Sequence, residues 1–277
     1  MTCQRIPRYN TDINIDNCKN LIDLSLFISG IKTIDFQQSN TLENVTLLGC
    51  NNLTSVILSD CQNLDSLRIS LVLEALDVDI SGCRNLRSLI LDVEKLNKLN
   101  AAGCSALKSF KYQSDSYNPP IWNLTSLNMS NCTSLASLLC NNNKLIYLNV
   151  SGCTALTTLE CAGNKLTALD VSDCMALITL SCYSNNLEVL KMSGNKFLTS
   201  LSCDNNKLTT LDVSGSIALK ELRCANNKLK ELDAYTCLAL KTLNCFGNSD
   251  LLTLTLNKNH QITALNKDDH TQIVLKE

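Results

Sequence analysis

The sequence predicts a solenoid, a stack of short coils built mostly from parallel β-strands with few or no α-helices. One observation is that a cysteine followed three residues later by an asparagine returns every 21 residues in the second half of the chain. Another is that each repeat divides into two halves that alternate as L-x-L or L-x-C, the period-two pattern of a strand. Because a half of about ten residues is too short for a stable helix, each repeat should form one coil, with a strand in its first half and an extended or 3₁₀ segment in its second.

Residues that return once per coil should stack into columns. The first half reads L-x-x-L-x-C-x-x-N-K and the second reads L-x-x-L-x-V-S-x-C-x-A, so the leucines of the two halves should fill the core from opposite walls. The first-half cysteines form a column that we call the cysteine ladder: Cys140, Cys161, Cys182, Cys203, Cys224 and Cys245. The asparagines three residues further on form the asparagine ladder: Asn143, Asn164, Asn185, Asn206, Asn227 and Asn248.

The chemistry of these residue types fits the two ladders. Cysteine is small, apolar and often fully buried, which suits the narrow interior of a short coil. Asparagine carries both donors and an acceptor, so it can satisfy backbone groups that a turn inside the stack removes from water. Parallel side chains in register do not present a good disulfide dihedral. We therefore expect the six thiols of the cysteine ladder to be unbridged.

A further cysteine column should mark the opposite corner of the coil, and we call it the corner column. Asparagine or serine replaces cysteine in two of its coils, so this corner should be less dry than the cysteine ladder. The corner column comprises Cys132, Cys153, Cys174, Asn195, Ser216 and Cys237.

The half-repeats define the domain organisation. They begin about every ten or eleven residues along almost the whole chain from Leu21 to Leu251, with two extra residues in the half that begins at Leu73. This predicts a solenoid of about eleven coils over residues 10–250 after a short segment at 1–9. An insertion near 111–123, within "YQSDSYNPPIWN", interrupts this period. The segment 251–277 leaves the period as well, and its apolar alternation predicts a β cap over the last coil, because an open solenoid end exposes core and strand edges.

Composition excludes several partner classes. The chain has 277 residues, a net charge of −2 and only 4% aromatic residues, so the core should be aliphatic. A charge this close to zero offers no footprint for nucleic acid or anionic lipid. No stretch approaches the ~18 apolar residues of a membrane helix, so we expect no membrane insertion. The beginning, "MTCQRIPRYN", lacks the apolar run of a signal peptide. Two interpretations stay open: a cytoplasmic protein, and a protein whose targeting segment is absent from this sequence.

Catalysis receives little support from the residue types present. The two histidines, His260 and His270, both lie in the C-terminal segment, and the nearest ladder cysteine, Cys245, should be buried and inert. The sequence has no glycine-rich phosphate loop and no HExxH motif. An aspartate that recurs in the second halves supplies too few oxygens to hold calcium. We expect no enzymatic activity, no cofactor and no metal.

The first-half pattern resembles the leucine-rich-repeat family. The 21-residue period, the inward cysteine and the "LTxLDVSxC/N" complement are most similar to its cysteine-ladder members, such as internalin J and leucine-rich surface proteins of gut bacteria. The resemblance is close over residues 124–250 and looser over 10–123. It implies a leucine-rich-repeat solenoid, α/β by convention, whose L-x-x-L-x-C strands line a concave sheet. It also implies a secreted or cell-surface bacterial protein that serves adhesion or recognition.

The outward positions beside the cysteine ladder are the candidate binding residues. Tyrosine, arginine and other large side chains are the types enriched at interface hot spots. Asp204 and Arg223 lie on adjacent coils and could instead pair with each other. Trp122, in the insertion, either contacts a partner or fills a gap in the irregular coil. The candidates are Glu160, Tyr183, Asp204, Arg223, Phe246 and Trp122.

Three functions follow from these candidates. The first is a monomeric, non-catalytic module that binds a protein, such as a host surface or matrix protein, through the concave face and the insertion. The second is a structural spacer or stalk within a larger surface protein. The third is a glycan-binding accessory protein, which is less favoured because Tyr183 and Phe246 are three coils apart, roughly 14 Å at the usual strand spacing.

Overall fold

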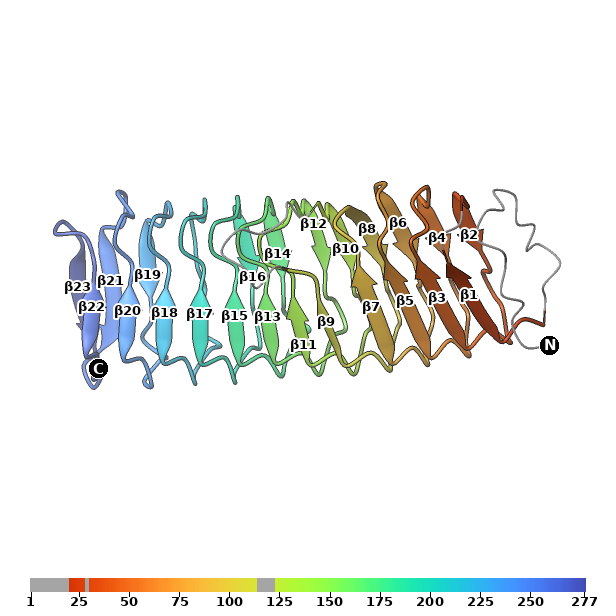
Figure 1. Cartoon of the computed structure of the whole chain (residues 1–277). Coiled ribbons are helices and arrows are strands. Elements are labelled where there is room, and N and C mark those ends of the chain that lie inside the picture. Colours follow the sequence, from red (N-terminus) through yellow and green to blue (C-terminus); the bar gives the residue numbers. More distant parts are fainter. Residues whose placement is uncertain (1–19, 28–29, 114–122) are drawn as a thin grey trace. The chain divides into compact units, whose positions relative to one another are not determined.

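The computed structural model describes residues 20–27, 30–113 and 123–277 (Figure 1). Within these residues the regular structure consists of 23 short β-strands, and no helix occurs. The chain forms two compact units. The first contains Met1–Leu135 and Asn143–Leu148, and the second contains Ala136–Asn142 and Asn149–Glu277. Each is a stack of parallel strands, as the repeat predicts.

The first unit carries strands in both halves of its coils. Its first-half strands are β1 (Asp23–Phe27), β3 (Asn44–Leu48), β5 (Ser66–Ser70), β7 (Ser88–Asp92) and β9 (Ser109–Lys111). The strands β1-β3-β5-β7 form one parallel sheet in that order. Its second-half strands are β2 (Thr33–Asp35), β4 (Ser55–Ile57), β6 (Leu76–Asp79), β8 (Leu96–Asn100) and β10 (Ser126–Asn128), followed by β12 (Tyr147–Asn149), and they form a second parallel sheet.

The sequence predicted only extended or 3₁₀ segments in the second halves, whereas the structure has hydrogen-bonded strands there. Ile34 pairs with Val56, and Val56 pairs with Val78, while every flanking strand residue except Ile57 is polar. All three are buried. Because the second half also alternates apolar-in and polar-out, it satisfies the period-two pattern and pairs into a strand ladder.

The first-half strands of the second unit form a regular sheet (Figure 1). Their register advances by one 21-residue repeat, so Leu159 pairs with Leu180 and Leu180 pairs with Leu201. The predicted stacking of equivalent residues is therefore present. The strands, in sheet order, are β11 (Ser137–Leu139), β13 (Thr158–Glu160), β15 (Thr179–Ser181), β17 (Ser200–Ser202), β18 (Glu221–Arg223), β20 (Thr242–Asn244) and β22 (Ala264–Asn266).

The second-half strands of this unit are interrupted. One pair consists of β14 (Ala168–Asp170) and β16 (Val189–Lys191), and a separate sheet consists of β19 (Glu231–Asp233), β21 (Thr253–Asn257) and β23 (Gln272–Lys276). Between them, residues 209–213 form no strand and make no backbone hydrogen bond to β16 or β19. We call this segment the ladder break.

Two features of the sequence coincide with the ladder break. The corner column holds Asn195 and Ser216 there, and the Asn195 Oδ1 and Ser216 Oγ atoms are buried without a hydrogen-bond partner. The Sγ of Cys174 and of Cys237 donates to a carbonyl of the preceding coil, at 3.5 and 3.4 Å, and the Asn195 Nδ2 donates to the Val171 carbonyl at 3.2 Å. Asp212 and Asp233 also occupy equivalent positions of neighbouring coils, and like charges opposed across a strand pair are unfavourable.

The segment 251–277 continues the stack in parallel register. Strand β22 pairs with β20, and β23 pairs with β21. Residues that were expected to cover the last coil thus add a coil of their own, and β22 and β23 are the last strands of their sheets.

The core of both units is aliphatic and rich in cysteine. The fourteen cysteines among the described residues are all buried. Within the cysteine ladder, Cys161, Cys182, Cys203, Cys224 and Cys245 are unbridged thiols, as expected from their parallel register.

Candidate functional site

The candidate site lies on the outward side of the first-half sheet of the second unit, which we call the binding face. The backbone beneath it is fixed by the asparagine ladder. The Asn185 Nδ2 donates to the carbonyls of Cys161 at 3.0 Å and Cys182 at 3.1 Å. The Asn185 Oδ1 accepts the N–H of Leu166 at 3.0 Å. One side chain therefore joins two coils at the residue that follows each strand.

The same bonds recur in successive coils. The Oδ1 atoms of Asn206, Asn227 and Asn248 accept the N–H groups of Leu187, Leu208 and Leu229 at 2.9–3.1 Å. Buried polar atoms with several partners hold a backbone in one arrangement. The outward residues that follow each ladder cysteine are therefore presented at fixed intervals.

The ladder thiols are structural groups. Burial raises the pKa of Cys161, Cys182, Cys203 and Cys224 well above the usual thiol value. Burial, followed by the charge of Asp268, raises the pKa of Cys245 to about 11. A thiol is nucleophilic as the thiolate. At neutral pH these cysteines stay protonated inside the core and are unsuited to covalent catalysis.

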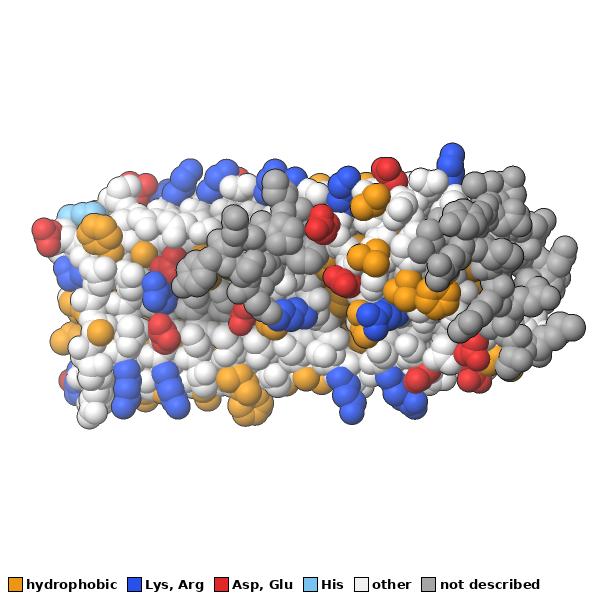
Figure 2. All heavy atoms as spheres, viewed as in Figure 1, with side chains coloured by type: hydrophobic (Ala, Val, Ile, Leu, Met, Phe, Trp, Pro, Cys, Tyr) orange, Lys and Arg blue, Asp and Glu red, His pale blue; other side chains and the backbone are white. Residues whose placement is uncertain are grey.

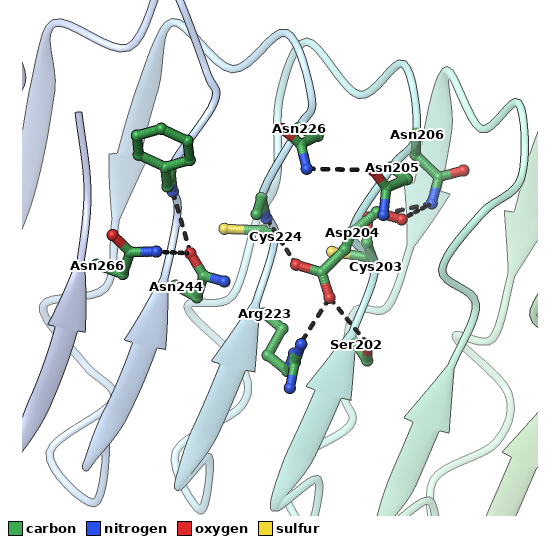
Figure 3. Close-up of polar contacts among 12 residues, drawn as sticks. Ser202, Cys203, Asp204, Asn205, Asn206, Arg223, Cys224, Asn226, Asn244 and Asn266 are labelled. Carbon is green, nitrogen blue, oxygen red and sulfur yellow. Dashed lines mark hydrogen bonds and ion pairs between the residues drawn. The ribbon is translucent and has the colours of Figure 1, made fainter.

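Asp204 is the most constrained of the candidate residues (Figure 3). It is only 7% exposed, and its carboxylate accepts hydrogen bonds from the Ala225 N–H at 2.9 Å and the Ser202 hydroxyl at 3.1 Å. Its Oδ2 also lies 3.3 Å from the Arg223 Nε, which is the pairing that their adjacent coils suggested. Asp204 therefore holds Arg223 in place and has little surface left for a partner.

Glu160 and Asn141 form a similar polar contact three coils earlier. The Asn141 Nδ2 donates to Glu160 at 2.8 Å, and the Asn141 Oδ1 accepts the N–H of Ala162 at 2.7 Å. Asn141 and Asp204 thus perform the same task of capping an N–H in the next coil. Glu160 is half-buried and already bonded.

Three candidate residues are left exposed on the binding face. The aromatic side chains of Tyr183 and Phe246 are 44% and 50% exposed, and Arg223 is exposed between them. Tyr183 and Phe246 occupy the same column three coils apart, roughly 14 Å at the usual strand spacing. In Figure 2, basic and acidic side chains lie close together over β18, whereas the surface over β20 is mainly white, the colour of the backbone and of uncharged polar side chains. Trp122 lies outside the described residues.

The residues that could carry chemistry do not assemble into a site. The His260 Nδ1 accepts the N–H of Asn257 at 3.0 Å, and its Nε2 lies 2.7 Å from the Cys237 carbonyl, so this ring holds the turn that follows β21. In the described ranges, no group of three histidine, cysteine or acidic side chains is placed to hold a metal ion. Over the same ranges, no helical span has the length and apolarity needed to cross a bilayer.

A pocket lies away from the binding face, over the ladder break. It is lined by residues of the second-half side, among them Leu211, Asp212, Glu231, Asp233 and Tyr235. Sequence reasoning did not identify this pocket. The available signal was the replacement of cysteine by asparagine and then serine in the corner column.

Sequence reasoning also missed how the asparagine ladder is closed. The Asp268 carboxylate accepts the N–H groups of Gly247 at 3.1 Å and Asn248 at 3.0 Å. One coil earlier the equivalent turn N–H, that of Asn226, is accepted by the Phe246 carbonyl at 2.8 Å, so the carboxylate takes the place of a backbone carbonyl. The aspartate follows a lysine in "NKDDH", a stretch without the repeat pattern that identified the other ladder residues.

Comparisons with known proteins agree with this architecture. Neither the protein-family models nor the curated proteins gave a match. Among solved structures, the functional domain of InlJ from Listeria monocytogenes, which includes a cysteine ladder, superposes with a TM-score of 0.56 at 28% identity. The match covers 91% of this chain and 54% of the InlJ domain.

The chain is a leucine-rich-repeat solenoid with a cysteine ladder. It spans about half the length of the InlJ domain. The internalin InlF of Listeria monocytogenes is also similar, with a TM-score of 0.40 at 17% identity. That match covers 96% of this chain and 85% of the InlF chain. YopM of Yersinia enterocolitica has a TM-score of 0.40 at 19% identity over 94% and 66% of the two chains.

Proposed function

We propose that this solenoid is a non-catalytic binding module that engages a protein partner through the binding face. The observation that carries the proposal is the arrangement of Tyr183, Arg223 and Phe246. Two exposed aromatic side chains flank a guanidinium group on a surface that is otherwise small and polar. Aromatic and arginine side chains supply most hot-spot energy in protein interfaces.

The surroundings of Arg223 favour this role. The buried Asp204 carboxylate holds its Nε at 3.3 Å, and the rest of the guanidinium fork stays exposed. A group that is ordered before binding loses less conformational entropy when a partner arrives. The remaining N–H donors of the fork suit a carboxylate or a backbone carbonyl of a protein partner.

The likeness to the InlJ domain supports a role in recognition at a cell surface. We accordingly propose a secreted or surface-attached bacterial protein whose partner is an exposed protein, such as a host surface or matrix protein. The insertion near 111–123, with Trp122, is proposed as a second contact region. A glycan platform is less favoured because the two aromatic side chains are too far apart to sandwich one sugar ring.

The test is binding of the purified chain to a panel of extracellular-matrix proteins, with a glycan array in parallel. For the matrix protein that binds, we expect Tyr183→Ala, Arg223→Ala and Phe246→Ala each to weaken the affinity at least about tenfold. The matched control is Met175→Ala, which truncates an exposed apolar side chain in a turn away from the binding face.

The outcomes separate the candidate functions. Unchanged capture in all three variants would remove the binding face from consideration. Binding restricted to the glycan array would favour a glycan-binding accessory protein. A chain that captures nothing in either assay would favour a structural spacer.

A further inference from the structure

We propose that the turns of three successive coils in the second unit form a docking surface for an amphipathic α-helix of another protein, one that carries acidic residues beside its apolar face. These turns precede β17, β18 and β20 and lie outside the strands that carry the binding face. We call this surface the turn band. Its side chains are Lys196, Phe197, Ile217, Lys220, Leu238 and Lys241.

The apolar side chains of the turn band form a continuous exposed row. Phe197, Ile217 and Leu238 are 54%, 58% and 58% exposed. Ile217 and Leu238 occupy the same position of neighbouring coils, and Phe197 lies one position further along in the preceding coil. Because β17, β18 and β20 pair in register one repeat apart, equivalent residues of these coils are roughly 4.8 Å apart. A contiguous apolar surface of this kind marks an interaction site.

The fold does not require large apolar residues at these positions. Thr133 and Thr154 occupy the position of Ile217 and Leu238 in two earlier coils, whose strands β11 and β13 pair in the same register. Phe197 likewise stands where the coils on either side have alanine. Packing of the solenoid therefore gives no reason for the three exposed apolar side chains, whereas a contact with a partner would remove them from water.

Lysine side chains flank the apolar row. Lys220 and Lys241 occupy equivalent positions of adjacent coils, where like charges oppose each other unfavourably. Within the described residues, neither they nor Lys196 form an ion pair, although charged side chains elsewhere pair across coils. Figure 2 shows basic and hydrophobic side chains next to one another along the lower edge, below β18 and β20. The missing counter-charges point to carboxylates on the partner.

An acidic residue marks one end of the turn band. Asp173 lies in the corresponding turn one coil before Lys196, at a position that is glycine in the next two coils. Its Oδ2 accepts the N–H of Gly152 at 3.1 Å, so this carboxylate belongs to the preceding turns. The basic, apolar surface is therefore limited to three coils, a length of roughly 10 Å between the first and the last.

The spacing of the row favours a helix over an extended peptide. Side chains three or four residues apart on one face of an α-helix are about 4.5–6 Å apart along its axis. That interval matches the step of roughly 4.8 Å between coils. Alternate residues of a strand are about 6.6–6.8 Å apart and would be out of step after two coils. A helix laid along the row would thus contact each coil once, with its acidic residues beside the lysines.

The test is binding of the whole purified chain to synthetic helical peptides of about 18 residues, or five turns, measured by fluorescence anisotropy. The glutamate peptide has leucine at every third or fourth position and glutamate on both sides of that face. The lysine peptide is its matched control, with lysine in place of each glutamate. We expect the glutamate peptide to bind with a dissociation constant of roughly 1–100 µM, and the lysine peptide to bind at least about tenfold more weakly.

Variants of the chain test the surface itself. Ile217→Thr and Leu238→Thr introduce the residue that earlier coils carry, so both should fold, and each should raise the dissociation constant at least about fivefold. The double variant Lys220→Glu with Lys241→Glu should reverse the preference, so that the lysine peptide binds more tightly than the glutamate peptide. Ile146→Thr, at an exposed isoleucine of the first unit, should leave both affinities unchanged.

Several results would overturn the proposal. They are a glutamate peptide that does not bind, equal affinities for the two peptides, and affinities that neither threonine variant changes. A chain that binds vesicles of phosphatidylcholine and phosphatidylserine but neither peptide would assign the turn band to a lipid surface instead. Tyr183→Ala, on the binding face, should leave peptide binding unchanged, so this test and that of the proposed function can fail separately.

Discussion

Asn206 illustrates how single residues hold the coils together. Its Nδ2 donates to the carbonyls of Cys182 and Cys203, both at 3.1 Å, and its Oδ1 accepts the N–H of Leu187 at 2.9 Å. The side chain is buried, so without it the Leu187 N–H would be left unpaired and out of reach of bulk water, while the Cys182 and Cys203 carbonyls would each lose one of two amide donors. The cost of leaving buried polar groups unpaired exceeds the gain of an average hydrogen bond.

Replacing Asn206 by alanine should therefore destabilise the second unit by about 2–4 kcal/mol. Urea unfolding followed by circular dichroism measures this change. Lys207→Ala, one residue further on and exposed, should stay within about 0.5 kcal/mol of the unaltered chain. Equal effects of the two substitutions would mean that the asparagine ladder does not stabilise the stack.

At the same scale, residue patterns predicted some roles and missed others. The buried positions of Cys203 and Asn206 followed from their exact recurrence. The contact between Asp204 and Arg223 followed from their places on adjacent coils. The burial of Asp204 did not, because it depends on the Ala225 N–H turning toward the carboxylate, a detail of backbone direction that the period does not contain. The binding role of Tyr183 stays a prediction.

At the scale of elements, the second halves differ between coils that share nearly one sequence. "LTALDVSDC" contains the strand β14, whereas the similar "LTTLDVSGS" contains the ladder break. The two differ at three positions, one of them in the corner column, where Ser216 stands in place of cysteine. Propensity could not distinguish them, because the strand depends on pairing with its neighbours and not on its own residues.

Ser216→Cys should restore the residue type of the corner column and stabilise the unit by about 1 kcal/mol. The expected gain comes from removing a buried hydroxyl that has no hydrogen-bond partner. Thermal and urea unfolding measure it, with the exposed Lys241→Ala as the neutral control. A loss of stability would show that the hydroxyl is satisfied by bound water, for which the neighbouring Asn195 Oδ1 offers a second partner.

At the scale of the whole molecule, the buried thiols make the stability of the fold depend on pH. Burial raises the pKa of Cys161, Cys182, Cys203 and Cys224 in the folded chain above the usual value of 9.0. The folded chain then binds these protons more tightly than the unfolded chain does. The associated stability is complete below pH 9 and is lost as the pH rises from there toward the folded pKa values.

Stability should accordingly fall between pH 9 and 10.5, by up to ~1.4 kcal/mol per pH unit for each buried thiol. Urea unfolding at a series of pH values measures this slope under reducing conditions. Cys203→Ala should lower the overall stability. It should also reduce the slope of unfolding free energy against pH by the contribution of one buried thiol. A stability that is level across this range would contradict the burial of the ladder.

The ladder break has a consequence for how the second unit opens. Stacked repeats hold together through contacts between nearest neighbours, and unfolding spreads along such a stack from wherever those contacts are weakest. At residues 209–213 the second-half backbone ladder is missing, so the coils are joined there by the first-half strands, the core and a few turn and side-chain hydrogen bonds such as that from Cys237 to Val213. Amide protons there should exchange with solvent ahead of those in β14 and β21, and the coils on either side can fray as two separate foldons. Although its repeats are nearly uniform in sequence, the second unit should therefore contain a boundary at residues 209–213 between two groups of coils that unfold separately.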